Sequence, residues 1–355
     1  MGLKVAVVGG GIAGLTAAWE LVQGGAEPVV LETGPRAGGV IVTERRDGCI
    51  VEGGPDGFLA SESELPELAR QTGIADRVVE QRARGSSLWT GTRLEPLEEG
   101  RAAALLGIAV APEGVSQGFR SFAGGMADIV EAAAARLGQA VRVKSAVASV
   151  VQSASGYRLA MTGGGDVEVA GVVLAVPAWV AARFLSSLGV RLAEDLVEVH
   201  YFPSLTVSLV YDEQQVRAPL EGTGFVVAQD APASGGVLRA CTYASRKFPD
   251  RAPEGQVLLR AFLGAVDKDP GAVAHALLAN ILAITGSPLW TKAFSWVRGL
   301  PRYGPDHAAR VTALRALIDR LPPLAIAGAG IDGAGVSACV RSGRTAARLI
   351  LARLS

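Results

Sequence analysis

Short apolar runs alternate with helical patterns at both ends of the chain. Near the start, Lys4–Val8 is apolar and rich in valine, as expected of a strand buried on both faces. The pattern changes to helical spacing over residues 15–21 and returns to a second apolar run at 28–31. Near the end, residues 324–327 form another apolar run ahead of a helix that starts near Val336. These alternations predict a parallel sheet whose strands are joined by helices.

The middle of the chain carries the shorter period of half-buried strands. Residues 205–211 alternate between apolar and polar positions, so one face of this strand is expected to be polar. The predicted strands are 205–211, 224–227, 236–242 and 256–263, and one helix is predicted over 270–284. Strands of this kind, joined without intervening helices, predict a mostly antiparallel sheet.

The segments between these two regions lead back to the first sheet. They are predicted as a helix at 128–137, a hairpin made of 141–150 and 156–159, and a strand at 172–177. We therefore predict an α/β fold with two domains. One is a Rossmann-like domain with a parallel sheet, helices and a β-hairpin layer, and the other is a smaller α+β domain with a mostly antiparallel sheet.

The sequence order makes the first domain discontinuous. Its predicted parts are 1–85, 115–185 and 320–355. The second domain is predicted to contain 86–114 and 186–319. A chain of this length is long enough for one large domain or two smaller ones.

A glycine-rich turn follows the first predicted strand with the spacing Gly9-x-Gly11-x-x-Gly14. Gly9 permits a tight turn, and Gly11 lets the backbone approach a pyrophosphate. Gly14 lets the helix pack closely on the strand. The backbone amides at the start of that helix, from Ile12 and Ala13 onward, are expected to face the phosphates. Strand, spacing and helix together predict a dinucleotide site.

The end of the second predicted strand adds an acid and a basic loop to this site. Glu32 lies about 20 residues past the glycines, where a carboxylate accepts the ribose hydroxyls and disfavours a 2′-phosphate. Arg36 follows closely and is expected to reach the pyrophosphate, with Gly38 and Gly39 allowing a close turn around it. The alternative for this loop is a surface turn with a solvated arginine. A simple NAD-binding domain does not need such a loop.

A second glycine cluster stands near the end of the chain, between the last predicted strand and the last predicted helix. It includes Gly328, Ala329, Gly335 and Val336. A dinucleotide held from both ends of one sequence is a more specific indication than a single fingerprint, and the cofactor we predict is FAD. The alternative is a glycine-rich turn before a surface helix.

Composition narrows the function classes. Lys plus Arg and Asp plus Glu both number 34, so no net charge favours nucleic acid or an anionic surface. Three cysteines and three histidines are scattered, which predicts neither a disulfide framework nor a metal site. No apolar run reaches the length of a membrane span. We expect a cytoplasmic protein, and peripheral contact with the inner face of the membrane stays open.

Several motifs resemble those of the protoporphyrinogen and coproporphyrinogen oxidases, within the wider group of flavin amine oxidases. They lie at 34–39, 51–58, 122–126, 141–159, 172–177, 296–307 and, as the strongest match, 327–343. The resemblance implies that Gly54, Pro55 and Asp56 pass beside the flavin and that the backbone of Val147 bonds to the adenine. It also implies that Trp296 and the closing motif contact the cofactor. The helix near Val336 would then favour the negative charge of the reduced flavin.

The resemblance has one large gap. Relatives carry a long helical segment where this chain has only a short stretch near 97–118, with room for at most one short helix around 101–106. Relatives also place an arginine for a substrate propionate where this chain has two serines, at 86 and 87. We predict Arg84 or Arg93 as its replacement, with a solvated loop charge as the alternative.

Two aromatic residues of the second domain, Phe225 and Tyr243, are candidates for lining the substrate pocket. A place in the structural core is the commoner role for such residues. We predict no certain catalytic side chain, because the flavin itself carries the difficult chemistry.

The function that the resemblance implies is the oxidation of a porphyrinogen by FAD, with dioxygen as the acceptor, in porphyrin and haem biosynthesis. One alternative is an amine oxidase, for which Lys247 or Lys292 would have to reach the flavin. Ala329, Ser337 and Cys339 lack the aromatic and acidic character that amine oxidases show in the closing motif. A flavoprotein with weak or no catalysis is a third hypothesis, and a plain NAD dehydrogenase is the weakest. The chain is expected to be a monomer or a homodimer, and apolar residues at 105–110 would invite a dimer or a membrane.

Overall fold

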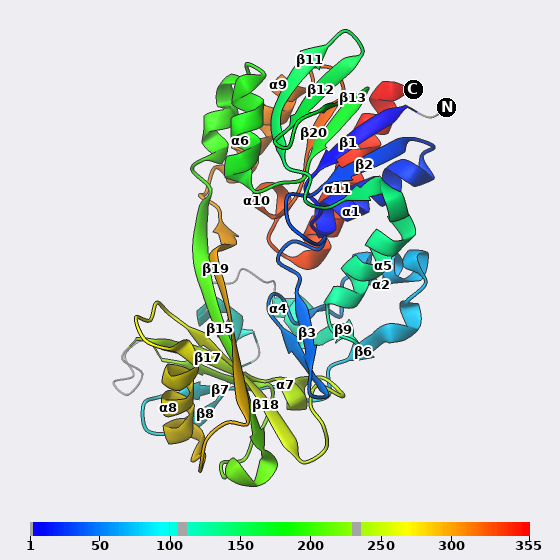
Figure 1. Cartoon of the computed structure of the whole chain (residues 1–355). Helices are drawn as coiled ribbons and strands as arrows, with labels where there is room; N and C mark the ends of the chain where they lie inside the picture. Colours follow the sequence, from blue (N-terminus) through cyan, green and yellow to red (C-terminus); the bar gives the residue numbers. More distant parts are fainter. Residues whose placement is uncertain (1–2, 99, 106–111, 229–235) are drawn as a thin grey trace.

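The computed structural model describes residues 3–98, 100–105, 112–228 and 236–355 (Figure 1). Within this part, a parallel-sheet domain, here the first domain, occupies the upper half of Figure 1. A seven-stranded sheet, here the second domain, occupies the lower half.

The first domain is built on five parallel strands. Their order across the sheet is β10 (Val141–Arg142), β2 (Glu27–Leu31), β1 (Lys4–Val8), β14 (Gly171–Leu174) and β20 (Leu324–Ile326). All four residues of β14 and all three of β20 are buried, which explains their continuous apolar sequence. The chain leaves β1 for β2 on one side and returns with β14 on the other, so the sheet order switches direction at β1.

Helices cover one face of this sheet. They are α1 (Ile12–Gln23), α2 (Glu64–Thr72), α5 (Ala127–Leu137) and the red C-terminal helix α11 (Val336–Leu354) of Figure 1. Their buried side chains form one core with Val5, Val7 and Val30 of the sheet.

The other face is covered by a β-layer and by helices. The layer is β11 (Val147–Ser153), β12 (Gly156–Met161) and β13 (Asp166–Val169). The helices are α6 (Ala178–Ser187), η3 (Arg191–Leu196) and α9 (His307–Ile318). The side chains of η3 and α9 share a core with Ala6 and Val8 of β1. This packing differs from the predicted boundaries at 186 and 319, because both elements pack with the first domain.

The second domain is a sheet with one helix packed on it. Its strand order is β19 (Trp290–Arg302), β15 (His200–Asp212), β18 (Gln256–Leu263), β17 (Leu238–Tyr243), β16 (Gly224–Val227), β7 (Ser86–Trp89) and β8 (Leu94–Leu97). Neighbouring strands are antiparallel except β16 and β7. Helix α8 (Pro270–Leu282) begins after Asp269, whose carboxylate accepts a hydrogen bond from the Ala272 amide at 2.8 Å. It covers the face that carries Tyr211 and Leu259.

Shorter elements join the two domains. The strands among them are β3 (Thr43–Arg46), β4 (Cys49–Glu52), β5 (Phe58–Leu59), β6 (Val78–Glu80) and β9 (Phe119–Phe122). The helices and turns are η1 (Ala75–Arg77), α3 (Arg101–Leu105), α4 (Pro112–Ser116), η2 (Gly138–Ala140), η4 (Glu213–Gln215), α7 (Ala244–Lys247) and α10 (Ala329–Asp332).

Two predictions about these elements were wrong in detail. Residues 141–150 are not one hairpin strand, because β10 joins the parallel sheet beside β2 while only β11 pairs with β12. The short stretch near 97–118 holds a second helix, α4, besides α3. Leu105 is 38% exposed, and residues 106–110 lie outside the described part of the chain.

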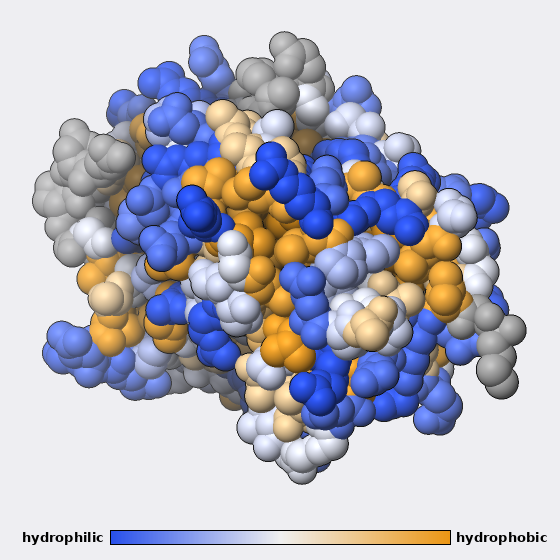
Figure 2. Space-filling model, turned by 90° about the horizontal axis from the view of Figure 1, so that it is seen from above, coloured by the Kyte–Doolittle hydropathy of each residue, from blue (hydrophilic) through white to orange (hydrophobic). Residues whose placement is uncertain are grey.

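None of the helices in the described residues combines the length and apolar character that crossing a bilayer requires. Seen from above, apolar residues reach the surface in several patches, with hydrophilic residues between and around them (Figure 2).

Candidate cofactor site

The first turn of α1 has backbone amides without acceptors in the described residues. The helix begins after Gly11, which has no side chain to cap it, and the first amide bonded to the backbone behind it is that of Leu15, 2.9 Å from the Gly11 oxygen. A side chain added at Gly11 would meet no atom within 4 Å. The amides of Ile12 and Ala13 therefore begin a positive helix end that faces open space.

The other two glycines of this turn are required by packing. Gly9 has a φ of +104°, which disfavours any side chain. A Cβ at Gly14 would lie 1.9 Å from the Gly9 oxygen, so only glycine lets α1 approach the strand this closely.

Glu32, the residue predicted to accept the ribose hydroxyls, lies at the edge of the turn. Its two carboxylate oxygens accept hydrogen bonds from the amides of Gly10, at 2.7 Å, and Gly34, at 2.6 Å. Each carboxylate oxygen has further lone pairs, so the group can still accept hydrogen bonds from hydroxyls.

Arg36 shapes its own loop. Its guanidinium donates to the backbone oxygens of Ala37 at 2.9 Å, Gly39 at 2.7 Å and Ile41 at 3.1 Å. The amide of Gly38 donates to Gly10 at 2.7 Å, which fixes this loop against the glycine turn. A hollow of about 200 Å³ opens beside the loop, lined by Arg36, α5 and β3.

The closing glycine cluster lies against the first one. A Cβ at Gly343 of α11 would lie 2.2 Å from the Ala13 oxygen, so the two helices pack in direct contact. Helix α11 begins after Gly335 without a side-chain cap, and its first backbone bond from this turn runs from Cys339 to Gly335 at 3.0 Å. The amides of the first turn, from Val336 to Ala338, have no acceptor in the described residues. Two uncapped helix starts and one carboxylate suit an anionic dinucleotide.

The segment 53–56 is held from several sides. Trp296 donates from its ring nitrogen to the Gly53 oxygen at 2.7 Å. Arg260 donates to the Gly54 oxygen at 2.6 Å, and Lys247 lies 2.8 Å from the Asp56 carboxylate. A Cβ at Gly54 would lie 1.9 Å from the Val40 oxygen, next to the glycine pair at 38–39.

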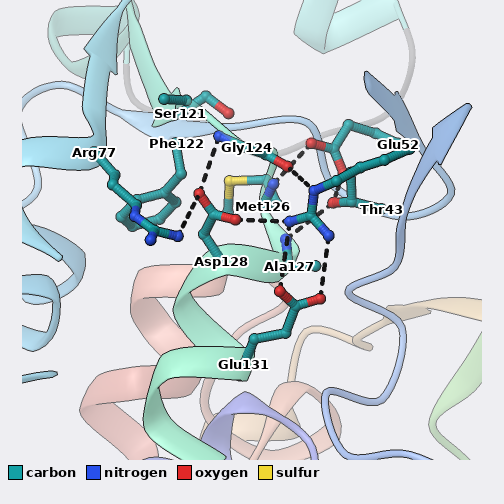
Figure 3. A network of polar contacts seen from close by, with 12 residues as sticks. Thr43, Glu52, Arg77, Ser121, Phe122, Gly124, Met126, Ala127, Asp128 and Glu131 are labelled. Carbon is teal, nitrogen blue, oxygen red and sulfur yellow. Dashed lines mark hydrogen bonds and ion pairs between the residues drawn. The ribbon is translucent and has the colours of Figure 1, made fainter. Parts of the chain in front are cut away.

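A polar network ties β3 and the end of β4, directly before this segment, to α5 (Figure 3). Glu52 accepts from the Met126 amide and the Thr43 hydroxyl, both at 2.7 Å. Asp128 accepts from the Gly124 amide at 3.0 Å and pairs with Arg45 at 2.7 Å. Burial raises the pKa of Glu52, and its hydrogen bonds and nearby arginines only partly offset this. Sequence reasoning missed the network, because the contacts of Glu52 with Met126 and of Arg45 with Asp128 join positions more than seventy residues apart.

Comparison with known proteins decides the family. Residues 12–105 and 84–351 match the protein family described as flavin containing amine oxidoreductase. The chain belongs to this family. It is therefore an FAD-dependent oxidoreductase, and its free amides and carboxylate fit the cofactor.

Three relatives sharpen this assignment. The coproporphyrinogen III oxidase of Bacillus subtilis is 24% identical over 96% of both chains, and that of Staphylococcus aureus is 22% identical over 99% of both. A provisionally assigned protoporphyrinogen oxidase from Exiguobacterium sp. 255-15 has the same fold, with a TM-score of 0.85, 22% identity and 99% coverage of both chains. The Bacillus alignment spans 458 positions against 355 residues here, so that relative has segments without a counterpart in this chain.

The two aromatic residues considered for the substrate pocket of this flavin oxidoreductase lie in the structural core, which was the alternative role for them. Phe225 and Tyr243 are 2% and 1% exposed and lie in the core under α8. Along a strand alternate side chains point to opposite faces. Because Thr242 pairs with Arg260, the neighbouring Tyr243 faces away from the side that carries Arg260.

The basic pocket candidates are placed away from the cofactor segments. Arg84 donates to the backbone oxygens of Ser116 and Gln117 at 2.7 and 3.0 Å, and so holds the end of α4. Arg93 forms an exposed ion pair with Glu95 at the turn between β7 and β8. For Arg93 the alternative of a solvated loop charge is the one that agrees with the structure.

The remaining cofactor candidates stay predictions. Val147 stands at an irregular register at the start of β11. Gly328 has a φ of +112°, and its amide donates to the Ser342 hydroxyl at 2.9 Å. Ala329 begins α10, and the Tyr303 hydroxyl donates to its backbone oxygen.

Proposed function

We propose that this flavoprotein oxidises a porphyrinogen to a porphyrin, with dioxygen as the electron acceptor, as a step of porphyrin and haem biosynthesis. The observation that carries the proposal is the similarity to curated coproporphyrinogen III oxidases along almost the whole chain. When bound, FAD would supply the hydride acceptor for each of the three two-electron oxidations that convert a porphyrinogen to a porphyrin, and three molecules of dioxygen would be reduced to three of hydrogen peroxide.

In this mechanism the residues of the chain bind the cofactor and orient it. The uncapped amides at the starts of α1 and α11 neutralise negative charge, and Glu32 accepts from hydroxyls. The positive end of α11 favours an electron-rich cofactor, which suits hydride acceptance. An added acid or base is not required for hydride transfer.

The lysines bear on the amine oxidase alternative. Lys247 is 12% exposed and forms an ion pair with Asp56, while Lys292 pairs with Glu44 at 2.6 Å. Both ammonium groups are engaged, so neither is available as a free amine beside the cofactor. These contacts favour the hypothesis of a porphyrinogen substrate over that of an amine substrate.

Anaerobic mixing tests the proposal. Coproporphyrinogen III and protoporphyrinogen IX are each mixed with the FAD-loaded protein in the absence of oxygen, and the flavin absorbance near 450 nm is followed. We expect bleaching with at least one of them and recovery of the yellow colour, with peroxide, on admission of air. A protein that holds FAD fully but stays yellow with both substrates contradicts the proposal and supports a flavoprotein without this catalysis. Bleaching by putrescine or cyclohexylamine instead supports the amine reading.

A further inference from the structure

One turn of the first domain is gripped by two side chains from the second. Trp296 on β19 donates to the Gly53 oxygen and Arg260 on β18 donates to the Gly54 oxygen, at 2.7 and 2.6 Å. The two side chains share a face of the sheet, because Ser204 pairs with Trp296 and Ser208, four residues on, pairs with Arg260. The second domain thus holds two consecutive carbonyl groups of the first.

The hydrogen bond from Trp296 polarises the peptide unit between Gly53 and Gly54. The carbonyl of this unit accepts from Trp296, and the N–H on its other side belongs to Gly54. No acceptor for the Gly54 amide is found among the described residues, and Gly54 is only half-buried. A peptide whose oxygen accepts a hydrogen bond becomes a stronger donor at its nitrogen. The turn therefore presents a free, polarised donor.

Arg260 is an unusual residue to bury for stability alone. It is 6% exposed, and its Nε has no hydrogen-bond partner in the described residues. No carboxylate of the described chain lies within ion-pair distance of it. Its other contacts are the ring of Phe262, at 4.9 Å, and the Gly54 oxygen. Burial disfavours the charged guanidinium, and the nearby carboxylates of Asp56 and Glu52 offset this only in part, so burial of Arg260 is not explained by core packing alone.

The position of the turn connects it to the cofactor segments. Gly54 packs on Val40, and the preceding pair, Gly38 and Gly39, lies against the start of α1, with Gly39 close to the Gly11 Cα. A continuous backbone path thus leads from the free helix amides to the turn that Arg260 holds.

We propose that Arg260 and Trp296 are positioning residues that hold the Gly53–Gly54 turn against FAD, and that the buried charge of Arg260 favours the reduced cofactor. The inference rests on the predicted placement of residues 54–56 beside the flavin, which belongs to the proposed function. Reduced flavin carries extra negative charge, so a fixed cation held in a low-dielectric interior raises the reduction potential.

Three variants separate the two parts of the proposal. Trp296→Phe removes the indole donor and keeps an aromatic ring. Arg260→Lys keeps the charge and loses the reach to Gly54, and Arg260→Gln loses the charge. The matched controls are Trp290→Phe on the same strand and Arg239→Gln on the exposed side of β17. FAD affinity is measured by titrating the apoprotein, and the midpoint potential by equilibration with redox dyes.

We expect the FAD dissociation constant to rise about tenfold in all three variants, since each loses about one hydrogen bond, worth roughly 1.4 kcal/mol. The potential should fall in Arg260→Gln and stay near that of the unchanged protein in Arg260→Lys, and both controls should keep affinity and potential.

Unchanged affinity in Trp296→Phe and Arg260→Lys would overturn the positioning role, and equal potentials in Arg260→Lys and Arg260→Gln would overturn the charge role. If Arg260→Gln does not fold, Arg260→Met, which also removes the charge, takes its place, and a potential equal to that of Arg260→Lys overturns the charge role. None of these readouts uses a porphyrinogen, so they can fail or succeed independently of turnover.

Discussion

The hydroxyl of Ser342, on α11, lies 2.5 Å from a carboxylate oxygen of Asp332, on α10. The same hydroxyl accepts from the Gly328 amide, and Arg315 holds Asp332 with two contacts of 2.8 and 2.9 Å. This chain of contacts fixes the closing glycine turn from the side opposite its open backbone.

Replacing Ser342 by alanine should destabilise the protein by about 1–3 kcal/mol, because it leaves the buried Gly328 amide without its acceptor and removes one donor from the Asp332 carboxylate. Urea unfolding of the FAD-loaded and FAD-free protein measures the effect. Ser155→Ala, in an exposed turn, is the control and should leave the free energy of unfolding unchanged. Equal stability of Ser342→Ala and the control would contradict this account.

Gly14→Ala should destabilise the protein by about 1–3 kcal/mol, since the new Cβ would overlap the Gly9 oxygen at 1.9 Å. The overlap also displaces the turn, so FAD occupancy after purification should fall. Gly163→Ala, where an added Cβ meets no atom within 4 Å, provides the matched control. Full FAD occupancy of Gly14→Ala would show that the close approach of α1 is not needed.

Glu32→Gln should raise the FAD dissociation constant about tenfold, because a neutral amide accepts hydrogen bonds more weakly than a carboxylate and has one oxygen fewer. Titration of apoprotein with FAD, followed by flavin fluorescence, gives the value. Glu168→Gln, exposed on β13, should bind FAD as before. An unaltered constant in Glu32→Gln would remove Glu32 from the cofactor site.

Stability should depend on pH through Glu52. Burial raises the pKa of this carboxyl in the folded protein, so the folded state binds the proton more tightly than the unfolded state. The resulting contribution to stability is complete below the unfolded pKa, about 4.3, and is lost as pH rises through the folded value. Glu52→Gln, which cannot ionise, should lose less stability over this interval. Urea midpoints across a pH series test this, and parallel curves for both proteins would count against it.

The cysteines should resist alkylation in the folded protein. Cys49, Cys241 and Cys339 are all buried and free. Burial raises the pKa of Cys339 to about 12, so at pH 8 only about one thiol in ten thousand is the reactive thiolate. Mass spectrometry after iodoacetamide treatment should find no label at pH 8 and three labels after unfolding in urea. Rapid labelling of the native protein would show that these sites open readily.

Local patterns were enough to predict four of the five strands of the parallel sheet. Strands β14 and β20 are wholly buried, and β1 and β2 are buried apart from their first residues, so their sequences are mostly apolar. The glycine spacing adds the turn, because Gly14 meets a stereochemical demand that no other residue satisfies.

The pocket could not be predicted in the same way. Alternation along a strand shows which side chains share a face, but not which face meets the cofactor. Phe225 and Tyr243, the candidates named from the sequence, lie in the core under α8, whereas Arg260, on the opposite face, was not among the candidates. The contacts of Arg45 with Asp128 and of Glu52 with Met126 join distant positions, and one sequence holds no signal for such pairs.

Strands β15 and β19 run as a paired ribbon from the seven-stranded sheet to the first domain (Figure 1). Each has 13 residues, a length of roughly 43 Å when extended. At the far end, the Tyr201 hydroxyl accepts from the Ala178 amide, and Tyr303 donates to Ala329. Because this two-stranded ribbon is fixed at both ends, it should resist bending between the two domains. The first and second domains should therefore move as one rigid body, and ligand exchange should depend on motions of shorter segments and not on a hinge between the domains.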